Sequence, residues 1–204
     1  RLEIPQARKV IAMLPGSRQS EVRNLADTYI ATARQLLVRD PELRFLVPLA
    51  TRETRLIFEE ALHRNEATEL PIRMLFGHAV EAMTAADVVL VASGTASLEA
   101  ALLKRPMVIT YRIGKWQYRL MKHMAYLPWV GLPNILCNKG VVPELLQDDA
   151  TPENLADAIE GWLQDAPRRA AVEARFMDLH LELRQDTARR AAEAILPYLS
   201  AASR

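Results

Sequence analysis

The chain has 204 residues, of which half are hydrophobic and a quarter are charged, and its formal net charge is +1. This composition is typical of a globular domain with its own core, and the near-neutral charge gives no general reason to expect nucleic acid as a partner. No hydrophobic run approaches the ~20 residues that a membrane-spanning helix requires. The single cysteine, Cys137, cannot form an internal disulfide and has no neighbouring metal ligands, which fits a reducing compartment.

Short hydrophobic segments alternate with amphipathic segments along the first half of the chain. Five hydrophobic segments are predicted to be β-strands: Val10–Leu14, Arg44–Leu49, Ile72–Phe76, Asp87–Ala92 and Met107–Tyr111. The segments between them have the hydrophobic spacing of helices, and the first helix is expected over residues 18–39 with Ser17 as its N-cap. This alternation predicts right-handed βαβ units, and therefore an α/β fold with a doubly wound parallel sheet.

From Thr151 onward the sequence predicts two or three helices, with Thr151 as an N-cap and Pro152 at the first helical position. We therefore divide the chain into a Rossmann-like domain at residues 1–150 and C-terminal helices at residues 151–204 that pack on it. Residues 1–5 contain no initiator methionine and nothing like a signal peptide, and a predicted strand follows almost at once. We therefore expect a fragment cut at a domain boundary.

The first candidate ligand-binding segment is LPGSR, at residues 14–18, where the first strand is expected to turn into a helix. Unpaired backbone amides and the positive end of a helix can bind an anion there, and Gly16 leaves room for close approach of a phosphate. Arg18 adds a permanently charged, bidentate donor. The alternative is an ordinary turn in which Ser17 caps the helix and Arg18 is solvated.

The second candidate segment is SGTASLE, at residues 93–99, which lies at another strand-to-helix junction. Ser93, Gly94 and Thr95 can donate hydrogen bonds to phosphate or ribose oxygens. Glu99 is the one charged residue in a predicted helix of Ala, Ser and Leu, and its position suits acceptance of hydrogen bonds from ribose hydroxyls. The alternative is a structural glutamate that pairs with an arginine.

Doubly wound sheets bind their ligands beyond the carboxyl ends of the strands. Both candidate segments are expected at this edge, together with Gly77 and His78 after the third predicted strand. His78 could contact a base or a sugar, although a helix-capping role suits it equally. Asn134, in the LPNIL segment, is a further polar side chain that we expect to point toward the ligand cleft.

Several familiar ligand-binding motifs are missing from these segments. Gly16 is not followed by the Gly-Lys-Ser/Thr of a P-loop, and neither segment has the G-x-G-x-x-G pattern of dinucleotide-binding folds. The four histidines lack metal-ligand spacing, and the acidic pair at residues 148–149 is expected in a loop. ATP hydrolysis and NAD chemistry therefore lose support, and we expect neither a metal nor a cofactor.

The central part of the chain has a one-sided charge. Between Glu99 and Glu144 there is no acidic residue but there are seven basic ones, so the net charge is +7 there and −6 elsewhere. A predicted amphipathic helix at residues 115–127 lies in this window. Its residues expected to contact an anionic membrane surface are Lys115, Trp116, Arg119 and Lys122. The alternative is a core-packed helix with a solvated basic face.

Six motifs follow one another in a characteristic order: IAMLPGSRQSEV, FLVPLA, ADVVLVASGTASLEAAL, PMVITYR, LPNILCN and PELLQ. In order and spacing they closely resemble the C-terminal half of the bacterial lipid-A-disaccharide synthase family. The resemblance covers essentially the whole chain. The SGT-x-x-LE pattern recurs in other glycosyltransferases of the GT-B fold, whereas the combination of LPGSR with LPN-[IL]-L is far more specific.

The resemblance implies a GT-B C-terminal domain of an inverting, metal-independent hexosyltransferase. The family joins UDP-2,3-diacylglucosamine to 2,3-diacylglucosamine 1-phosphate and releases UDP and the lipid A disaccharide, as a peripheral protein on the cytoplasmic face of the inner membrane. The residues expected to bind the UDP-sugar donor are Gly16, Ser17, Arg18, Gly77, His78, Ser93, Gly94, Thr95, Glu99 and Asn134. Arg18 is also the expected catalytic residue, because it would neutralise the departing UDP.

The resemblance also implies an N-terminal domain, which in the family carries most of the acceptor site and the catalytic base, and on which the helices at residues 151–204 would pack as well. We expect this domain to be missing here, and the fragment alone to be inactive. The expected partners are the UDP-diacylglucosamine donor, an acylated sugar phosphate acceptor and an anionic membrane surface, with a homodimer as a further possibility and no nucleic acid. Two alternatives stay open: a UDP-sugar 2-epimerase-like enzyme of the same fold, and a non-catalytic nucleotide-binding or dimerisation module.

Overall fold

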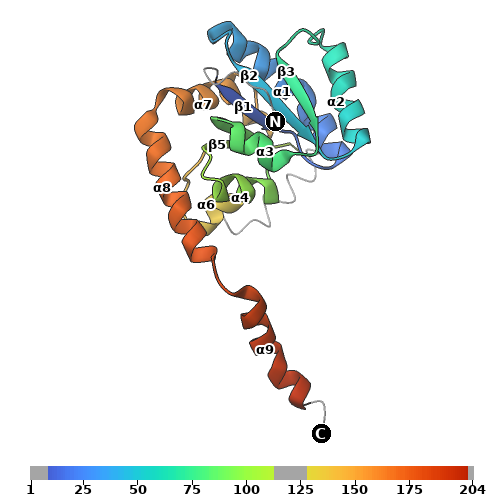
Figure 1. The fold of residues 1–204 in the computed structure, drawn as a ribbon. Helices are drawn as coiled ribbons and strands as arrows, with labels where there is room; N and C mark the ends of the chain where they lie inside the picture. Colours follow the sequence, from blue (N-terminus) through green and yellow to red (C-terminus); the bar gives the residue numbers. More distant parts are fainter. Residues whose placement is uncertain (1–8, 113–127, 202–204) are drawn as a thin grey trace.

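A parallel β-sheet forms the centre of the protein in the computed structural model, which describes residues 9–112 and 128–201 (Figure 1). In these residues its strands are β1 (Val10–Leu14), β2 (Arg44–Leu49), β3 (Ile72–Phe76), β4 (Val88–Ala92), β5 (Met107–Tyr111) and β6 (Glu144–Leu146). They are ordered β3-β2-β1-β4-β5-β6, and every neighbouring pair is parallel. The predicted doubly wound sheet is confirmed, and the short edge strand β6 was not predicted.

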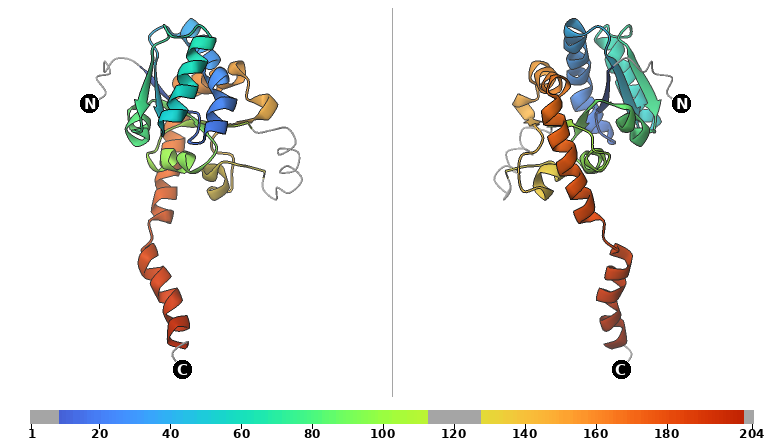
Figure 2. Two further views of the ribbon diagram at one scale, coloured as in Figure 1. Left: turned by 90° about the vertical axis from the view of Figure 1, so that its right-hand side faces the viewer. Right: turned by 60° about the vertical axis from the view of Figure 1, so that its left-hand side comes forward.

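Helices cover both faces of this sheet, and the last helix projects away from it (Figure 2). They are α1 (Gln19–Arg39), α2 (Arg52–Arg64), α3 (Ala79–Ala85), α4 (Thr95–Leu102), α6 (Leu132–Leu136), the 3₁₀ helix η1 (Gln147–Asp149), α7 (Pro152–Gln164), α8 (Ala166–Leu183) and α9 (Thr187–Ala201). Helix α1 packs against α2 and α7, whereas α4 packs against α3, α6 and α8. The first group lies on one face of the sheet, and α3 and α4 lie on the other (Figures 1 and 2).

The two central strands, β1 and β4, are buried along their whole length. Each is a continuous run of hydrophobic residues, as a strand requires when helices cover both of its faces. The chain leaves β1 toward β2 and leaves β4 toward β5, on the opposite side. A crevice therefore opens between the two strands at their carboxyl ends, which is the usual ligand position in such folds.

The helices after residue 150 share the hydrophobic core of the sheet. Trp162 of α7 is fully buried, and its indole Nε1 donates a hydrogen bond of 2.9 Å to the Met107 carbonyl of β5. The guanidinium of Arg168 lies over the same ring, 4.0 Å from its centroid. Phe176 of α8 is also buried in this core. As predicted, Thr151 caps α7, because its hydroxyl accepts a hydrogen bond from a backbone amide of the first turn.

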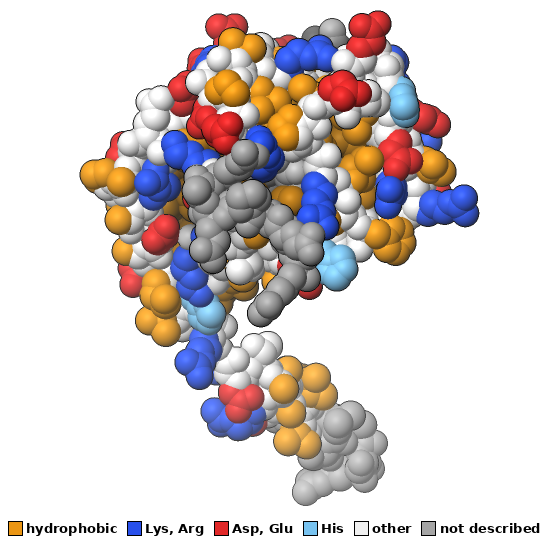
Figure 3. Space-filling model, turned by 45° about the horizontal axis from the view of Figure 1, so that its top comes forward, with side chains coloured by type: hydrophobic (Ala, Val, Ile, Leu, Met, Phe, Trp, Pro, Cys, Tyr) orange, Lys and Arg blue, Asp and Glu red, His pale blue; other side chains and the backbone are white. Residues whose placement is uncertain are grey.

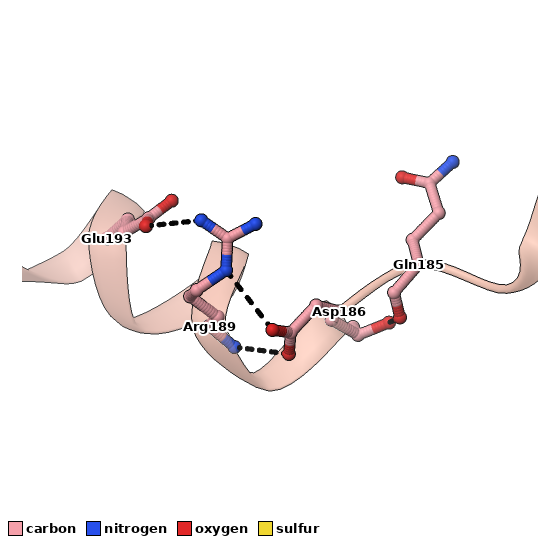
Figure 4. A network of polar contacts seen from close by, with 5 residues as sticks. Gln185, Asp186, Arg189 and Glu193 are labelled. Atoms are coloured by element: carbon pink, nitrogen blue, oxygen red, sulfur yellow. Dashed lines mark hydrogen bonds and ion pairs between the residues drawn. The ribbon is translucent and has the colours of Figure 1, made fainter.

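Helix α9 projects away from the sheet and the other helices (Figure 2), and hydrophobic side chains such as Ile195 are exposed on it (Figure 3). Polar contacts fix its start (Figure 4). The carboxylate of Asp186 accepts hydrogen bonds from the backbone amide of Arg189 at 3.3 Å and from its Nε at 3.1 Å. Arg189 also pairs with Glu193 at 2.9 Å. These side chains are exposed, so the ion pairs add little stability.

The predicted membrane contact belongs to the segment at residues 115–127. Its residues, Lys115, Trp116, Arg119 and Lys122, lie outside the described ranges. Within those ranges, none of the helices combines the length and the apolar character that crossing a membrane requires.

Replacement of Trp162 by phenylalanine should lower the free energy of unfolding by about 1.5–3 kcal/mol. The change removes buried ring volume and the hydrogen bond to the Met107 carbonyl. Urea denaturation followed by circular dichroism measures the loss. Val38→Ala serves as the control, since that side chain is 82% exposed, and should change stability by less than about 0.5 kcal/mol. Equal effects of the two substitutions would show that α7 does not belong to the core.

Candidate functional site

A cavity of about 450 Å³ lies at the carboxyl edge of the sheet, where β1 and β4 are neighbours. Its wall consists of the ends of β1, β2 and β4 and the starts of α1, α3 and α4. The residues that line it are Leu14, Gly16, Ser17, Arg18, Glu21, Pro48, Leu49, Ala50, Gly77, Ala79, Val91, Ala92, Ser93, Gly94, Thr95, Ala96 and Glu99. A cavity of this size suits a small-molecule ligand.

Most of the residues predicted to bind the ligand lie together in this cavity. Eight of the ten line it, namely Gly16, Ser17, Arg18, Gly77, Ser93, Gly94, Thr95 and Glu99. They come from three separate stretches of the chain, which the parallel register of the strands brings to one edge. The other two, His78 and Asn134, do not line the cavity.

The first wall is the turn between β1 and α1. Buried Tyr29 of α1 supports it, because its hydroxyl donates a hydrogen bond of 3.4 Å to the Leu14 carbonyl at the end of β1. Burial raises the pKa of Tyr29 well above its usual value, which keeps this hydroxyl a neutral donor. The prediction that Ser17 caps α1 is wrong. The N-cap is Arg18, where the backbone is still extended, and the helix begins at Gln19.

The backbone amides of this turn are already paired. Those of Ser17 and Arg18 donate to one oxygen of Glu21, Oε2, at 3.0 Å and 3.1 Å. The other oxygen, Oε1, lies 3.4 Å from Nη1 of Arg18. Our expectation of unpaired amides here is therefore wrong for the unliganded chain. A Glu three residues after an N-cap is half of a capping box, and this spacing is the sequence feature that could have revealed the contact.

Gly16 makes room for this carboxylate. Its φ is +114°, and a Cβ at this position would lie 2.4 Å from Oε2 of Glu21. The expectation that Gly16 allows an anion to approach the backbone closely therefore has a counterpart in the structure, although the anion is a side chain of the same helix.

The second wall is the start of α4, where no capping side chain accepts a hydrogen bond from the backbone. Gly94 is its N-cap, and within the described part of the chain no side chain accepts a hydrogen bond from its first amides. Thr95 and Ala96, the first residues of the helix, line the cavity. The positive end of α4 therefore faces the cavity without a bound anion.

Ser93, which precedes this helix start, is held in place by two hydrogen bonds that it donates to backbone carbonyls. Its backbone amide donates to the Thr110 carbonyl at 2.8 Å, and its hydroxyl donates to the Val130 carbonyl at 3.1 Å. Both of its donors are therefore used inside the protein, so the expectation that Ser93 donates hydrogen bonds to the ligand is wrong for the unliganded chain, and its hydroxyl oxygen retains only acceptor capacity.

Glu99 and Arg18 are the charged side chains of the cavity that retain free capacity. Glu99 is exposed and, among the described residues, forms no ion pair. The alternative of an arginine-paired structural glutamate therefore has no support in the geometry. The Arg18 side chain is 78% exposed, and its long contact with Glu21 leaves most of its donors open. Together with Glu21, the cavity carries one basic and two acidic side chains.

His78 points elsewhere. It precedes α3 in a left-handed conformation with φ +56°, and its side chain makes no capping hydrogen bond. Its Nδ1 lies 3.2 Å from Oε1 of Glu81, and both side chains are exposed. Hydrogen bonds from its own backbone amide and from His78 hold the pKa of Glu81 below its usual value. The structure thus gives His78 a surface contact, while its neighbour Gly77 lines the cavity.

Asn134 does not point into the ligand cleft as expected. It is completely buried, and its Nδ2 donates to the Val142 carbonyl at 2.9 Å and to Oε1 of Glu144 at 2.7 Å. Its Oδ1 accepts hydrogen bonds from the amides of Val141 and Val142 at 2.8 Å and 3.0 Å. These four bonds use the full capacity of the amide. Asn134 therefore joins α6 to the strand β6.

Glu144 extends this connection to the cavity wall. Its carboxylate also accepts hydrogen bonds from the amides of Val130 and Gly131 at 2.8 Å and 3.0 Å. The carbonyl of Val130 in turn accepts the hydrogen bond of Ser93. Asn134 and Glu144 thus help to position a residue of the cavity from a distance. Within the described ranges, no group of three or more histidine, cysteine, aspartate or glutamate side chains is arranged to hold a metal ion.

Solved structures with a similar fold identify the class of domain. One is an α,α-trehalose 6-phosphate synthase from Burkholderia multivorans, with a TM-score of 0.64 and 13% identity over 97% of this chain and 44% of that chain. Another is S. aureus MnaA in a co-structure with UDP, with a TM-score of 0.56 and 14% identity over 81% of this chain and 39% of that chain. At these identities the likeness concerns the fold alone, which is the Rossmann-like half of the GT-B architecture.

The particular family follows from sequence. Residues 1–197 match the family model described as lipid-A-disaccharide synthetase, and the chain belongs to this family. The lipid-A-disaccharide synthase of Aromatoleum aromaticum is 74% identical over 199 residues, which are 98% of this chain and 51% of that protein. That of an Azoarcus species is 70% identical over 203 residues, 100% of this chain and 52% of that protein. The resemblance inferred from the motifs is confirmed, and the chain spans about half the length of the curated relatives it matches.

Replacement of Asn134 by alanine should lower the free energy of unfolding by about 2–4 kcal/mol. It removes the hydrogen-bond partner of the Val141 and Val142 amides and of the Val142 carbonyl in a buried place, and one of the two hydrogen bonds to Oε1 of Glu144. Chemical denaturation measures the loss. The matched control is Asn24→Ala, which removes one exposed hydrogen bond of 3.4 Å and should have little effect. Unchanged stability of Asn134→Ala would contradict the structural role.

Proposed function

We propose that this chain is the donor-binding part of a hexosyltransferase that joins UDP-2,3-diacylglucosamine to 2,3-diacylglucosamine 1-phosphate, with release of UDP and the lipid A disaccharide. The cavity between the starts of α1 and α4 carries this proposal, because it combines an open helix end, a largely exposed guanidinium with one long contact to Glu21, and the unpaired carboxylate of Glu99. Membership of the lipid-A-disaccharide synthetase family supports the reaction. The curated relatives bear the name of the corresponding synthase.

The diphosphate would bind at the start of α4. The amides of Thr95 and Ala96 have no side-chain cap there, and the helix dipole favours a negative charge. Arg18 would reach across from α1 and bind a phosphate oxygen with its guanidinium, which has few contacts to break. Negative charge grows on the leaving UDP as the glycosidic bond to the donor breaks, so Arg18 would act as a catalytic residue by stabilising it.

The ribose would bind beside Glu99. This residue lies four positions after Thr95 in the same helix, so both side chains lie on one face of α4 and line one cavity. A free carboxylate accepts hydrogen bonds from two adjacent hydroxyls well, which suits a ribose. The co-structure of MnaA with UDP shows that a domain of this fold occurs in a protein that binds UDP.

The other candidate functions gain no specific support. A UDP-sugar 2-epimerase-like enzyme would share the fold, but family membership favours the transferase. A non-catalytic binding module would leave the exposed guanidinium of Arg18 beside the phosphate site without a purpose.

We also propose that the acylated substrates reach the site from the cytoplasmic surface of the inner membrane, with the basic segment around Lys115 as the membrane contact. A homodimer remains part of this proposal.

UDP should bind the chain and stabilise it by about 2.7 kcal/mol at a concentration of one hundred times its Kd, and ADP or NAD should do much less. Arg18→Ala should weaken UDP binding about 10- to 100-fold, because it removes hydrogen bonds from a charged donor. Isothermal titration calorimetry measures Kd directly. The matched control is Arg23→Ala, on the same helix, where the guanidinium bonds to Gln19 instead. Equal affinities of the Arg18 and Arg23 variants would refute the phosphate assignment.

Glu99→Ala should weaken the binding of both UDP and uridine by roughly tenfold, since the lost acceptor serves the ribose that both ligands contain. Arg18→Ala, in contrast, should leave uridine binding unchanged. Calorimetry with the two ligands on the two variants gives four comparisons. If loss of Glu99 affected UDP but not uridine, its ribose assignment would be wrong.

A further inference from the structure

Glu21 occupies the donors that a phosphate of the ligand would need. One of its oxygens accepts from the amides of Ser17 and Arg18, at 3.0 Å and 3.1 Å, and the other contacts the Arg18 guanidinium at 3.4 Å. Two backbone amides and a guanidinium are a donor set typical of phosphate sites. We propose that Glu21 is an intramolecular competitor for the donor phosphate, and that it thereby determines the affinity for UDP. This inference rests on the proposed function.

The contact goes beyond ordinary helix capping. In a capping box, the glutamate of the first turn accepts a hydrogen bond from the amide of the N-cap residue. Here Glu21 accepts from the N-cap residue Arg18 and also from Ser17, which lies before the helix. The turn therefore presents two convergent amides to a single oxygen, as an anion-binding loop does.

The position of the Glu21 carboxylate depends on the glycine at residue 16 and lies in the wall of the cavity. A Cβ at residue 16 would lie 2.4 Å from Oε2 and 2.6 Å from Cβ of Glu21, so the contact requires glycine at this position. Glu21 also lines the same cavity as the open end of α4, and its side chain is 18% exposed. A ligand that binds across the cavity would thus meet this carboxylate directly.

A carboxylate and a phosphate cannot share these donors. Both are anions, and at hydrogen-bonding distance their repulsion is not screened by intervening solvent. Binding of a phosphate to the amides of α1 therefore requires the Glu21 side chain to rotate away. The contacts that hold it in the structure, with Ser17 and Arg18, are the ones that the phosphate would replace. Glu21 accordingly raises the Kd for UDP and, by returning to the amides, favours release of UDP as a product.

Two variants of the chain test this competition, Glu21→Gln and Glu21→Ala. The first removes the charge and keeps an acceptor, and the second removes both. Isothermal titration calorimetry should give about tenfold tighter binding of UDP and of inorganic pyrophosphate for Glu21→Ala, with a smaller gain for Glu21→Gln, since one charge-assisted contact no longer competes. Uridine, which lacks phosphate, should bind all forms equally.

The control variant is Glu53→Gln, which removes the same charge from the first turn of α2 at a residue that does not line the cavity. It should leave UDP affinity unchanged. Circular dichroism establishes that each variant is folded at the temperature of the titration, and a gain in affinity cannot arise from unfolding.

The outcomes separate the two hypotheses. If the unaltered chain binds UDP and both Glu21 variants bind it equally or more weakly, the competition is refuted while the proposed function stands. If neither the unaltered chain nor the variants bind UDP, the proposed function fails and the competition fails with it. Binding by the variants alone would support the competition in its strongest form.

Discussion

The parallel pairing of β1 with β4 is the contact on which the arrangement of the cavity depends. Ile11 lies opposite Val88 and Leu14 lies opposite Val91, so both strands end at the same edge of the sheet. The helices that follow them, α1 and α4, therefore begin at that edge on opposite faces of the sheet, each with its positive end at the cavity (Figure 1). Sequence segments more than seventy residues apart thus form one cavity, and the two strands that bring them together are buried on both faces.

The two helix starts at the cavity differ in whether an anion accepts hydrogen bonds from their backbone amides. The start of α1 carries an anion from its own first turn, the carboxylate of Glu21, which Gly16 admits. The start of α4 carries none among the described residues. An incoming diphosphate would thus find one free site and one that it must compete for. The guanidinium of Arg18 is only partly paired, since it contacts Glu21 and is otherwise exposed to solvent.

The sequence was sufficient for the parts of the structure that local patterns determine. Strands β1 to β5 were predictable because each is a compact hydrophobic run between turn residues, and eight candidate residues met in one cavity because carboxyl ends of parallel strands share an edge. The strand β6 was missed, since its three residues are only partly buried and have no distinctive pattern. The N-cap of α1 was misassigned because Ser17 has the better capping side chain, whereas the backbone stays extended through Arg18 and the helix begins at Gln19.

Asn134 shows why polar residues in hydrophobic surroundings are hard to interpret from sequence. An amide aimed at a ligand and an amide that joins two loops look alike along the chain. The difference lies in Glu144 and in the amides of Val141 and Val142, which the fold brings to it. Its role at the cavity is therefore indirect, through Glu144, Val130 and Ser93.

The central claim is that a nucleotide diphosphate binds between the starts of α1 and α4. A titration of the ¹⁵N-labelled chain with UDP, followed residue by residue in amide NMR spectra, tests it most directly. The account predicts that the largest shifts occur at the amides of Ser17, Arg18, Thr95 and Ala96. Shifts confined to other parts of the surface, such as the smaller cavity of about 200 Å³ beside Lys9 and Arg39, would contradict it.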